Sequence, residues 1–336
     1  MAYLVFVSVA GDDRILCYAM HPDTGELALQ REIAVPGAPG PLAVDRERAL
    51  MYAALRGSRE LVTFRLDMTT GDLQPSSRVA LRSDPCYIAP DRTGRFLLSA
   101  YYAAGMVTVH RIGADGALSE QPIQVIATGP HAHCIQTDPT NRFVYVPHTV
   151  PTNAIFQFSF AADTGKLTPL SPPHAAVPDG VGPRHYCHHP RRDFVYVSNE
   201  QGSSVSAYRL DSATGILTCL QTISTLPAGY TGENTTAQIH LHPTGRFLYV
   251  SNRGHDSIAI LAVDETTGHL TSIGQQPSEP TPRTFNLDPS GHYLYAAGQG
   301  SGKLAAYRVD QSSGRLAPIA IYEAGRNPMW VLALQL

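Results

Sequence analysis

The chain has 336 residues, of which 43% are hydrophobic and 16% are charged, with a formal net charge of −3. This composition predicts a compact globular protein and excludes an intrinsically disordered chain. Because the net charge is slightly negative and no run of Lys or Arg stands out, binding to nucleic acid or another polyanion is not expected.

The first ten residues are apolar but carry no basic segment, so they fit a strand better than a signal peptide. No stretch approaches the ~18 to 20 apolar residues that a membrane helix needs, so no membrane association is expected. The cysteines are odd in number, scattered and without a CxxC pair; they are Cys17, Cys86, Cys134, Cys187 and Cys219. Such cysteines indicate reduced thiols and a cytoplasmic protein.

A turn of the form Asp/Thr-x-Gly-x-Leu follows an alternating apolar segment seven times along the chain. Its glycines lie 46, 45, 49, 50, 53 and 46 residues apart. They are Gly25, Gly71, Gly116, Gly165, Gly215, Gly268 and Gly314. Seven copies at this spacing predict a radial array of like units.

Each unit also contains a second turn, as at residues 91–95 and 242–246, followed by a strand-like run such as residues 247–250. An alternating segment such as residues 204–210 comes next, with apolar residues at period two. Each unit thus offers four short strands and no convincing helix. The fold expected is all-β: a seven-bladed β-propeller with four antiparallel strands per blade.

The two ends of the chain predict how the ring closes. Residues 3–8 have the pattern of a second strand, with no first strand before them, and residues 328–333 have the pattern of an unpaired first strand. We expect the C-terminal strand to complete the N-terminal blade and remove a free sheet edge. Residues 1–336 would then form a single domain, and a monomer is the expected state.

Strand direction sorts the connections into two faces. The starts of the first strands and the connections that follow the second strands share one face, here called the first face; the glycine turns lie on the opposite, second face. At the starts of the first strands, the equivalent positions are Gly40, Cys86, His133, Arg184, Ala237, Arg283 and Met329. After the second strands, they are Ala10, Arg56, Tyr102, Thr149, Glu200, Arg253 and Gln299.

These positions on the first face diverge in residue type, whereas the glycine turns are nearly uniform. They hold four arginines and one carboxylate, Glu200. A strand, a turn and a returning strand between residues 184 and 200 would bring Arg184 and His185 close to Glu200. Solvated loop arginines are the simpler alternative, but a group of four predicts a site for a small anionic ligand.

These residue types favour hydrolysis or acid–base isomerisation. Glu200 or a histidine could activate water, and an arginine could stabilise an oxyanion. Covalent catalysis is disfavoured because the chain has no G-x-S-x-G and no phosphate-binding glycine loop. His133, His185 and His240 are candidate zinc ligands, but His240 lies deeper along its strand and no short ligand spacing exists, so no metal or other cofactor is expected.

Several other polar or aromatic residues have simpler structural explanations. His188 and His189 lie near a turn of the second face and are expected to face solvent. Cys134 and Cys187 are expected to be small packing residues. Trp330 could form the floor of the channel, although packing between blades is the preferred interpretation.

Motifs over essentially the whole chain resemble the seven-bladed propeller lactonases, in particular the bacterial 6-phosphogluconolactonases. The densest matches run from residue 182 onward: Gly182-Pro183-Arg184-His185, Val197-Ser198-Asn199-Glu200, Ala237-Gln238-Ile239-His240, Asn252-Arg253, Pro282-Arg283-Thr284-Phe285-Asn286, Ala296-Ala297-Gly298-Gln299 and Asn327-Pro328-Met329-Trp330-Val331. The resemblance implies metal-free hydrolysis of 6-phosphogluconolactone. A fungal relative that interconverts carboxymuconate and its lactone suggests His133, Arg184, Glu200 and either Arg253 or Arg283 as catalytic groups.

The chain departs from this pattern at three places, which leave the identity of the lactone open. Tyr87 stands where the bacterial relatives tend to have a histidine, Tyr102 occupies a position that is often Asn, and the loop at residues 147–151 is unlike the family pattern.

The leading hypothesis is therefore a cytoplasmic lactonase for a small anionic lactone, most simply 6-phosphogluconolactone. Glu200 with His185 or His133 would activate water, and Arg184 would polarise the carbonyl. The expected substrate-binding residues are Arg253, Arg283, Arg56, Asn286, Gln299 and His240.

Two alternatives remain open. One is a lactonase or cycloisomerase for another carboxylated lactone of the muconolactone type, which the same arginines would suit. The other is a non-catalytic propeller that binds a protein or peptide, for which Tyr101, Tyr102 and Tyr230 are the candidate contacts.

Overall fold

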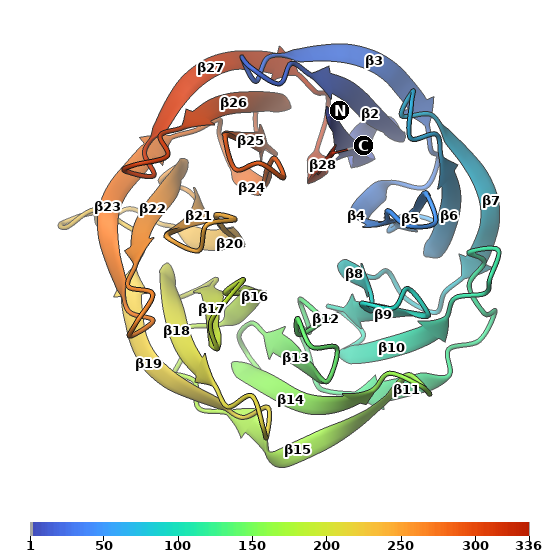
Figure 1. Cartoon of the computed structure of the whole chain (residues 1–336), viewed down its shortest axis with the longest axis horizontal. Helices are drawn as coiled ribbons and strands as arrows, with labels where there is room; N and C mark the ends of the chain where they lie inside the picture. Colours follow the sequence, from blue (N-terminus) through green and yellow to red (C-terminus); the bar gives the residue numbers. More distant parts are fainter. Residues whose placement is uncertain (1–2, 336) are drawn as a thin grey trace.

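The computed structural model describes residues 3–335 and contains seven four-stranded antiparallel sheets arranged in a ring (Figure 1). The predicted seven-bladed β-propeller is confirmed. Among the described residues, the one helical segment is the 3₁₀ turn η1 (Ala10–Asp12). No helix in this part of the chain is long and apolar enough to span a membrane.

The strands of each blade run from the centre of the ring outward (Figure 1). The innermost, or first, strands are β28 (Pro328–Gln335), β4 (Pro39–Asp45), β8 (Tyr87–Pro90), β12 (Gln136–Thr137), β16 (Pro183–His188), β20 (Thr235–Leu241) and β24 (Pro282–Leu287). The second strands are β1 (Tyr3–Val9), β5 (Leu50–Leu55), β9 (Phe96–Tyr101), β13 (Phe143–His148), β17 (Phe194–Asn199), β21 (Phe247–Arg253) and β25 (Tyr293–Gly298).

The two outer strands of each blade complete the sheets. The third strands are β2 (Arg14–Met20), β6 (Glu60–Leu66), β10 (Met106–Arg111), β14 (Ala154–Ala161), β18 (Ser204–Leu210), β22 (Ser257–Val263) and β26 (Lys303–Val309). The fourth strands are β3 (Leu27–Ala34), β7 (Leu73–Ala80), β11 (Gln124–Ala127), β15 (Lys166–Ala175), β19 (Leu217–Ser224), β23 (Leu270–Pro277) and β27 (Leu316–Glu323).

The ring closes through the two ends of the chain, as expected. Strand β28 pairs antiparallel with β1, from Tyr3 opposite Gln335 to Val9 opposite Pro328. The sheet order β28-β1-β2-β3 therefore joins the last strand to the first blade. This pairing occupies a hydrogen-bonding edge of β1 that an open array would leave free.

The uniform glycine turns are explained by the packing of one blade on the next. All seven glycines have φ between 71° and 87°, a region that favours glycine. At Gly215, an added Cβ would lie 2.2 Å from a ring carbon of Phe143, and the Gly215 carbonyl accepts a hydrogen bond from Tyr145 of the same preceding blade. The repeated motif thus both turns the chain and ties neighbouring blades together.

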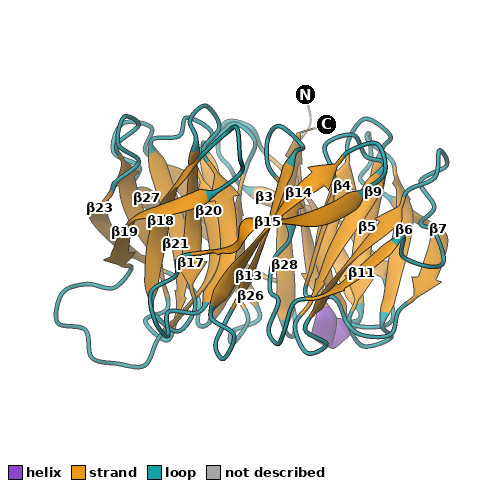
Figure 2. Ribbon diagram, turned by 90° about the horizontal axis from the view of Figure 1, so that it is seen from below, coloured by secondary structure: helices purple, strands orange, loops and turns teal. Residues whose placement is uncertain are grey.

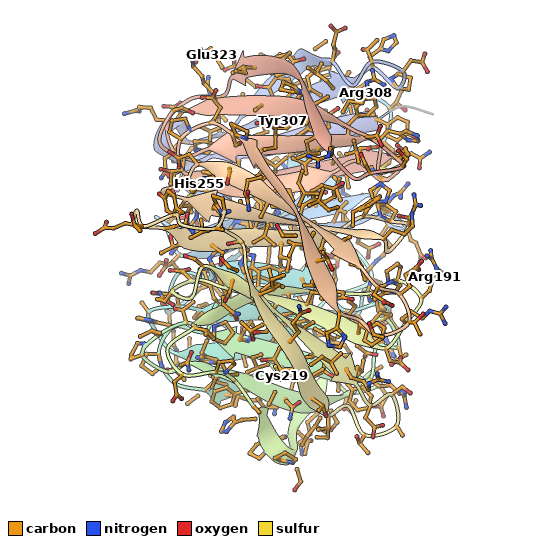
Figure 3. The ribbon with its side chains drawn as sticks, turned by 90° about the vertical axis from the view of Figure 1, so that its left-hand side faces the viewer. Arg191, Cys219, His255, Tyr307, Arg308 and Glu323 are labelled. Atoms are coloured by element: carbon orange, nitrogen blue, oxygen red, sulfur yellow. The ribbon has the colours of Figure 1, made fainter. Side chains whose placement is uncertain are left out.

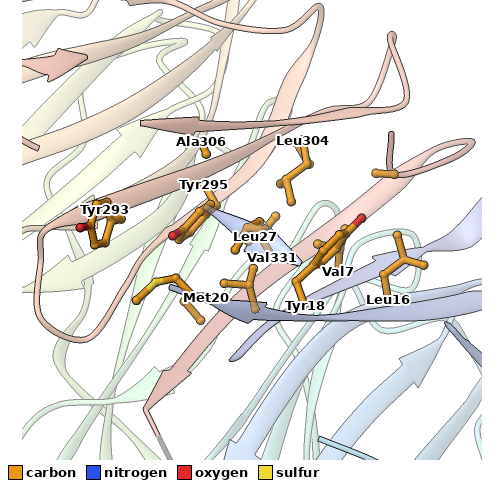
Figure 4. Close-up of a cluster of buried hydrophobic side chains, with 14 of the residues drawn as sticks. Val7, Leu16, Tyr18, Met20, Leu27, Tyr293, Tyr295, Leu304, Ala306 and Val331 are labelled. Atoms are coloured by element: carbon orange, nitrogen blue, oxygen red, sulfur yellow. The ribbon is translucent and has the colours of Figure 1, made fainter. Parts of the chain in front are cut away.

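The hydrophobic core consists of clusters between neighbouring blades. In the cluster shown in Figure 4, Tyr293, Tyr295 and Leu304 from one blade pack against side chains of the closing blade, among them Val7 and Val331. Each large apolar side chain buried in this way contributes about 1.5–3 kcal/mol relative to an exposed one.

The edge-on view shows strands crossing between two faces made of loops and turns, with η1 on one of them (Figure 2). Because η1 follows the second strand β1, it marks the first face. Figure 3 shows His255, which follows β21, and Arg191, which precedes β17, at opposite faces. The predicted separation of the two kinds of connection is therefore present.

Candidate active site

β-Bulges hold most of the divergent positions at the starts of the first strands. In β16, Pro183 pairs with Asn199 and His185 with Ser198, so Arg184 is an extra residue without an opposite partner. Arg283 is the extra residue in the same way between Pro282 and Thr284. A bulge interrupts the alternation of the strand and redirects a side chain, and both arginines line the central channel.

A carboxylate between two arginines forms the centre of the site. Oε2 of Glu200 lies 2.9 Å from Nε of Arg184 and 3.2 Å from an Nη of Arg253. The backbone brings these groups together, because the Glu200 amide donates a 2.6 Å hydrogen bond to the carbonyl of Gly182. Gly182 has a φ of +65°, a region that favours glycine, and an added Cβ would displace the side chain of Gln201.

The other two arginines of the site differ in their partners. Arg56 donates hydrogen bonds of 3.0 and 2.6 Å to Asp84. Arg283 makes no hydrogen bond or ion pair with any residue in the described range 3–335. Arg283 is therefore a cation that the protein itself leaves unpaired.

The arginines stay protonated although they are buried close together. Burial, reinforced by Arg253 and Arg283, lowers the pKa of Arg184 to about 9. Burial, reinforced by Arg253 and Arg56, lowers the pKa of Arg283 to about 10. At pH 7 four guanidinium groups therefore face two carboxylates, Glu200 and Asp84, which leaves an excess of positive charge for an anionic ligand.

Two histidines meet beside the arginines. Nδ1 of His133 lies 3.1 Å from Nε2 of His185, so one imidazole donates a hydrogen bond to the other. Burial lowers the pKa of both histidines well below the usual value, and Arg184 lowers it further. Both rings are neutral at pH 7. The sequence predicted that His185 would lie close to Glu200; in the structure the hydrogen-bond partner of its Nε2 is His133.

A small cavity lies beneath the arginines. It has a volume of about 10 Å³, measured as the space open to the centre of a water-sized sphere. Its lining consists of Pro41, Arg56, Cys86, His133, Arg184, His185, Gln238, Arg283, Met329 and Trp330. This volume is close to what one buried water needs and far too small for a sugar. A substrate must therefore bind above it, at the mouth of the channel.

A large cavity of about 340 Å³ lies on the side of the second face. His185 and Gln238 line both cavities and so stand between them. His240 lines only the large cavity, where its Nε2 lies 2.9 Å from Nε2 of Gln238. The expected depth of His240 is correct, and this depth places it away from the arginines.

The remaining predicted site residues lie outside both cavities. The side-chain amide of Asn286 lies 3.4 Å from the carbonyl of Val331, and Gln299 donates a 2.6 Å hydrogen bond to Asn327. These contacts support the closing strand and the segment before it. The structure therefore gathers the four arginines, His133, His185 and Glu200, and not Asn286, Gln299 or His240.

The expectation that His188 and His189 face solvent was wrong. His189 is buried, with 2% of its surface exposed, because its ring packs against Phe194 at the start of β17 and lies close to Gly245 of the next blade, and His188 is half-buried. Trp330 packs as expected and also lines the small cavity, where its ring meets Tyr87 edge-on and His185 at a tilt of 53°, so it forms part of the channel wall.

The sequence reasoning also missed Asp84 and Gln238. Asp84 lies in the connection before β8 and pairs with an arginine of the preceding blade, a contact that no local motif signals. Gln238 follows Ala237 in the bulge of β20, and the sequence Ala237-Gln238-Ile239-His240 was its only signal. Within residues 3–335, no group of three or more His, Cys, Asp or Glu side chains is arranged to hold a metal ion.

Comparison with known proteins gives consistent matches over nearly the whole chain. The family profile described as "Lactonase, 7-bladed beta-propeller" matches residues 5–333. The chain is 38% identical over 312 residues to a 6-phosphogluconolactonase of Pectobacterium carotovorum subsp. carotovorum, with 93% of each chain covered. It is 34% identical over 336 residues to the 6-phosphogluconolactonase of Serratia proteamaculans, with 99% of each chain covered.

Solved structures give the same result. The periplasmic gluconolactonase of Pseudomonas aeruginosa superposes with a TM-score of 0.91 at 26% identity, covering 100% of this chain and 99% of the other. A Bacteroides fragilis protein superposes with a TM-score of 0.90 at 28% identity, covering 99% and 98% of the two chains.

Proposed function

Because the chain belongs to the lactonase family of seven-bladed β-propellers, we propose that it hydrolyses 6-phosphogluconolactone to 6-phosphogluconate. The observation that carries this choice of substrate is the charge of the site. Four arginines against two carboxylates leave an excess of about two positive charges. A phosphomonoester carries about −1.5 to −2 at pH 7 and so matches this excess, whereas unphosphorylated gluconolactone carries no charge.

The unpaired arginine is the proposed phosphate ligand. Arg56, Arg184 and Arg253 already have carboxylate partners, so Arg283 has most to gain from an incoming anion. A charge-assisted hydrogen bond contributes about 1.5–3 kcal/mol. Arg253 and Arg56 lie close enough to Arg283 to repel its charge, and they would also donate hydrogen bonds to the phosphate oxygens.

The remaining groups provide the chemistry of ester hydrolysis without a covalent intermediate. Arg184 would stabilise the oxyanion that develops on the lactone carbonyl. The neutral pair of His133 and His185 offers an acceptor for the proton of water. Glu200 would hold Arg184 and Arg253 in place.

The test is the rate of opening of 6-phosphogluconolactone and of gluconolactone, each corrected for spontaneous hydrolysis. We expect the protein to prefer the phosphorylated lactone, with activity unaffected by a chelator. Arg283→Met should lower kcat/KM for the phosphorylated lactone by roughly 10- to 150-fold and leave the other lactone almost unchanged. Arg192→Met, in the exposed turn before β17, is the matched control.

Equal rates for the two lactones would refute the choice of substrate. Opening of a carboxylated muconolactone with neither sugar lactone accepted would favour the muconolactone-type alternative, because two carboxylates also carry two charges. No acceleration with any lactone would favour a binding protein.

The proposed compartment is the cytoplasm. All five cysteines are free. Burial raises the pKa of Cys86 to about 11, so this thiol is unreactive at pH 7. Free thiols fit a reducing compartment. The relative from Pseudomonas aeruginosa is periplasmic, so fractionation of the native protein is the relevant check.

A further inference from the structure

The small cavity and the groups that line it indicate where the hydrolytic water binds. We propose that this cavity is the water site, that His133 accepts the proton of the water, and that Glu200 is a positioning residue rather than the general base. This inference rests on the proposed function and adds an attack direction: the water approaches the lactone carbonyl from the channel side.

The size and lining of the cavity support a single water. About 10 Å³ is the volume of one water site, and a buried water typically makes two to four hydrogen bonds. Polar side chains from several blades meet there, including His133, Arg184, Gln238 and Arg283. The guanidinium groups of the three lining arginines, Arg56, Arg184 and Arg283, donate only, so an imidazole or the Gln238 carbonyl must accept from the water.

The hydrogen bond between the histidines determines which nitrogen of His133 can accept. Nδ1 of His133 faces Nε2 of His185, which leaves Nε2 of His133 for another partner. If His133 carries its hydrogen on Nδ1 and donates it to His185, its Nε2 bears a free lone pair. His185 then carries its own hydrogen on Nδ1, a buried atom without a hydrogen-bond partner among residues 3–335, and both rings are neutral.

Glu200 is excluded as the base by position and by its partners. It does not line the small cavity, and its Oε2 contacts both Arg184 and Arg253. Its other oxygen, Oε1, accepts a 3.4 Å hydrogen bond from the side-chain amide of Gln201. Glu200 therefore acts on the reaction through the two arginines that it holds.

The reaction balances without any further reactant. The water oxygen bonds to the lactone carbonyl carbon while one water proton moves to Nε2 of His133. The bond between that carbon and the ring oxygen then breaks, and the ring oxygen takes the proton from the His133 imidazolium to become a hydroxyl. The product acid releases its remaining proton to solvent as it leaves.

The large cavity lies on the other side of two residues that line the water site. His185 and Gln238 line both cavities, so their side chains separate the water site from the second face.

Competition between water and methanol tests the water site. A site for one water excludes methanol, so lactone opened by the protein in aqueous methanol should give free acid and no methyl ester beyond the spontaneous background. Methyl ester formed in proportion to the methanol fraction would overturn the proposal, because the nucleophile would then come from the open mouth. Absence of any lactone opening would instead refute the proposed function, and this inference with it.

Enlarging the cavity provides a second, positive readout. Gln238→Ala removes the side chain that lies between the two cavities and should admit methanol, so that methyl ester appears. Gln276→Ala in the outer strand β23 is the matched control and should give none. A folded Gln238→Ala protein that opens the lactone and still gives no ester would contradict the assigned site.

The kinetic constants separate the base from the positioning residue. His133→Asn should lower kcat by about 10²- to 10⁴-fold with KM nearly unchanged. Glu200→Gln should mainly raise KM and leave kcat within about tenfold. The reverse pattern would overturn the assignment.

Discussion

Replacing Glu200 by Gln should destabilise the protein strongly, because the change leaves two arginines without their carboxylate. Arg184 is only 2% exposed and lies next to Arg253 and Arg283, so water cannot compensate for the lost charge. Removing one partner of a buried ion pair costs about 3–5 kcal/mol. Glu200 and Arg253 each keep 15% of their side-chain surface exposed. Because water can partly solvate them, we expect a loss of stability at the lower end of this range, about 3 kcal/mol. This value corresponds to roughly a hundredfold change in the folding equilibrium.

A double-mutant cycle tests this reasoning more sharply than the single change. Arg184→Met with Glu200→Gln removes the most buried charge together with its partner, so the double variant should recover most of the loss. Unfolding in urea at pH 7, followed by circular dichroism and by the fluorescence of Trp330, the one tryptophan of the chain, would give the four free energies. Coincident curves from the two probes would justify a two-state analysis.

Glu233→Gln is the control for a loss of charge alone. Glu233 is exposed and lies in the connection between β19 and β20, so its replacement should change stability by less than about 0.5 kcal/mol. A loss below about 1 kcal/mol in Glu200→Gln, or a double variant as unstable as the sum of the single variants, would refute the argument.

Three further outcomes are expected. Gly215→Ala should lower stability by more than Gly229→Ala. Both glycines have φ near +80°, but only a Cβ at residue 215 would collide with Phe143. Equal shifts in the thermal midpoint of the two variants would contradict this. The kcat of the protein at saturating lactone should be flat from pH 8 to below 6.5 and fall only in more acidic solution, because burial lowers the pKa of His133 and the protonated ring cannot accept a proton. A fall in kcat centred near pH 6.5 would contradict this. Deleting residues 328–336 should lower the free energy of unfolding by more than about 4 kcal/mol or prevent folding, since β28 buries several apolar side chains against its neighbours. Cooperative urea unfolding of the truncated chain at an unchanged midpoint would contradict this.

The architecture could be predicted because its determinants are local and repeated. Each glycine turn requires a positive φ, and each turn packs on the start of a second strand in the preceding blade, so the motif recurs at a nearly fixed spacing. Closure followed from the strand patterns at the two ends. The contact between Arg184 and Glu200 followed from strand direction alone.

The partners within the site could not be predicted because they depend on contacts between different blades. Nothing near Asp84 in the sequence indicates that it pairs with Arg56, and nothing near His185 indicates that it faces His133. Burial could not be read from the local pattern either. His189 looks like a solvent-facing turn residue, yet its ring packs against Phe194 and lies close to Gly245 of the next blade. The pKa directions in the site depend on that burial and therefore need coordinates.

The β-bulges at the starts of the first strands allow the residue type at a site position to change without altering the alternation of side chains along the strand. In five blades the first strand has one residue more than the second strand at this point. The five divergent positions in these bulges are Gly40, Arg184, Ala237, Arg283 and Met329. A residue at a bulge lies outside this alternation, so it can change from glycine to arginine without exchanging the two faces of its strand. Substitutions at these positions, made one blade at a time by evolution or by design, can therefore change which ligand binds while the fold stays the same.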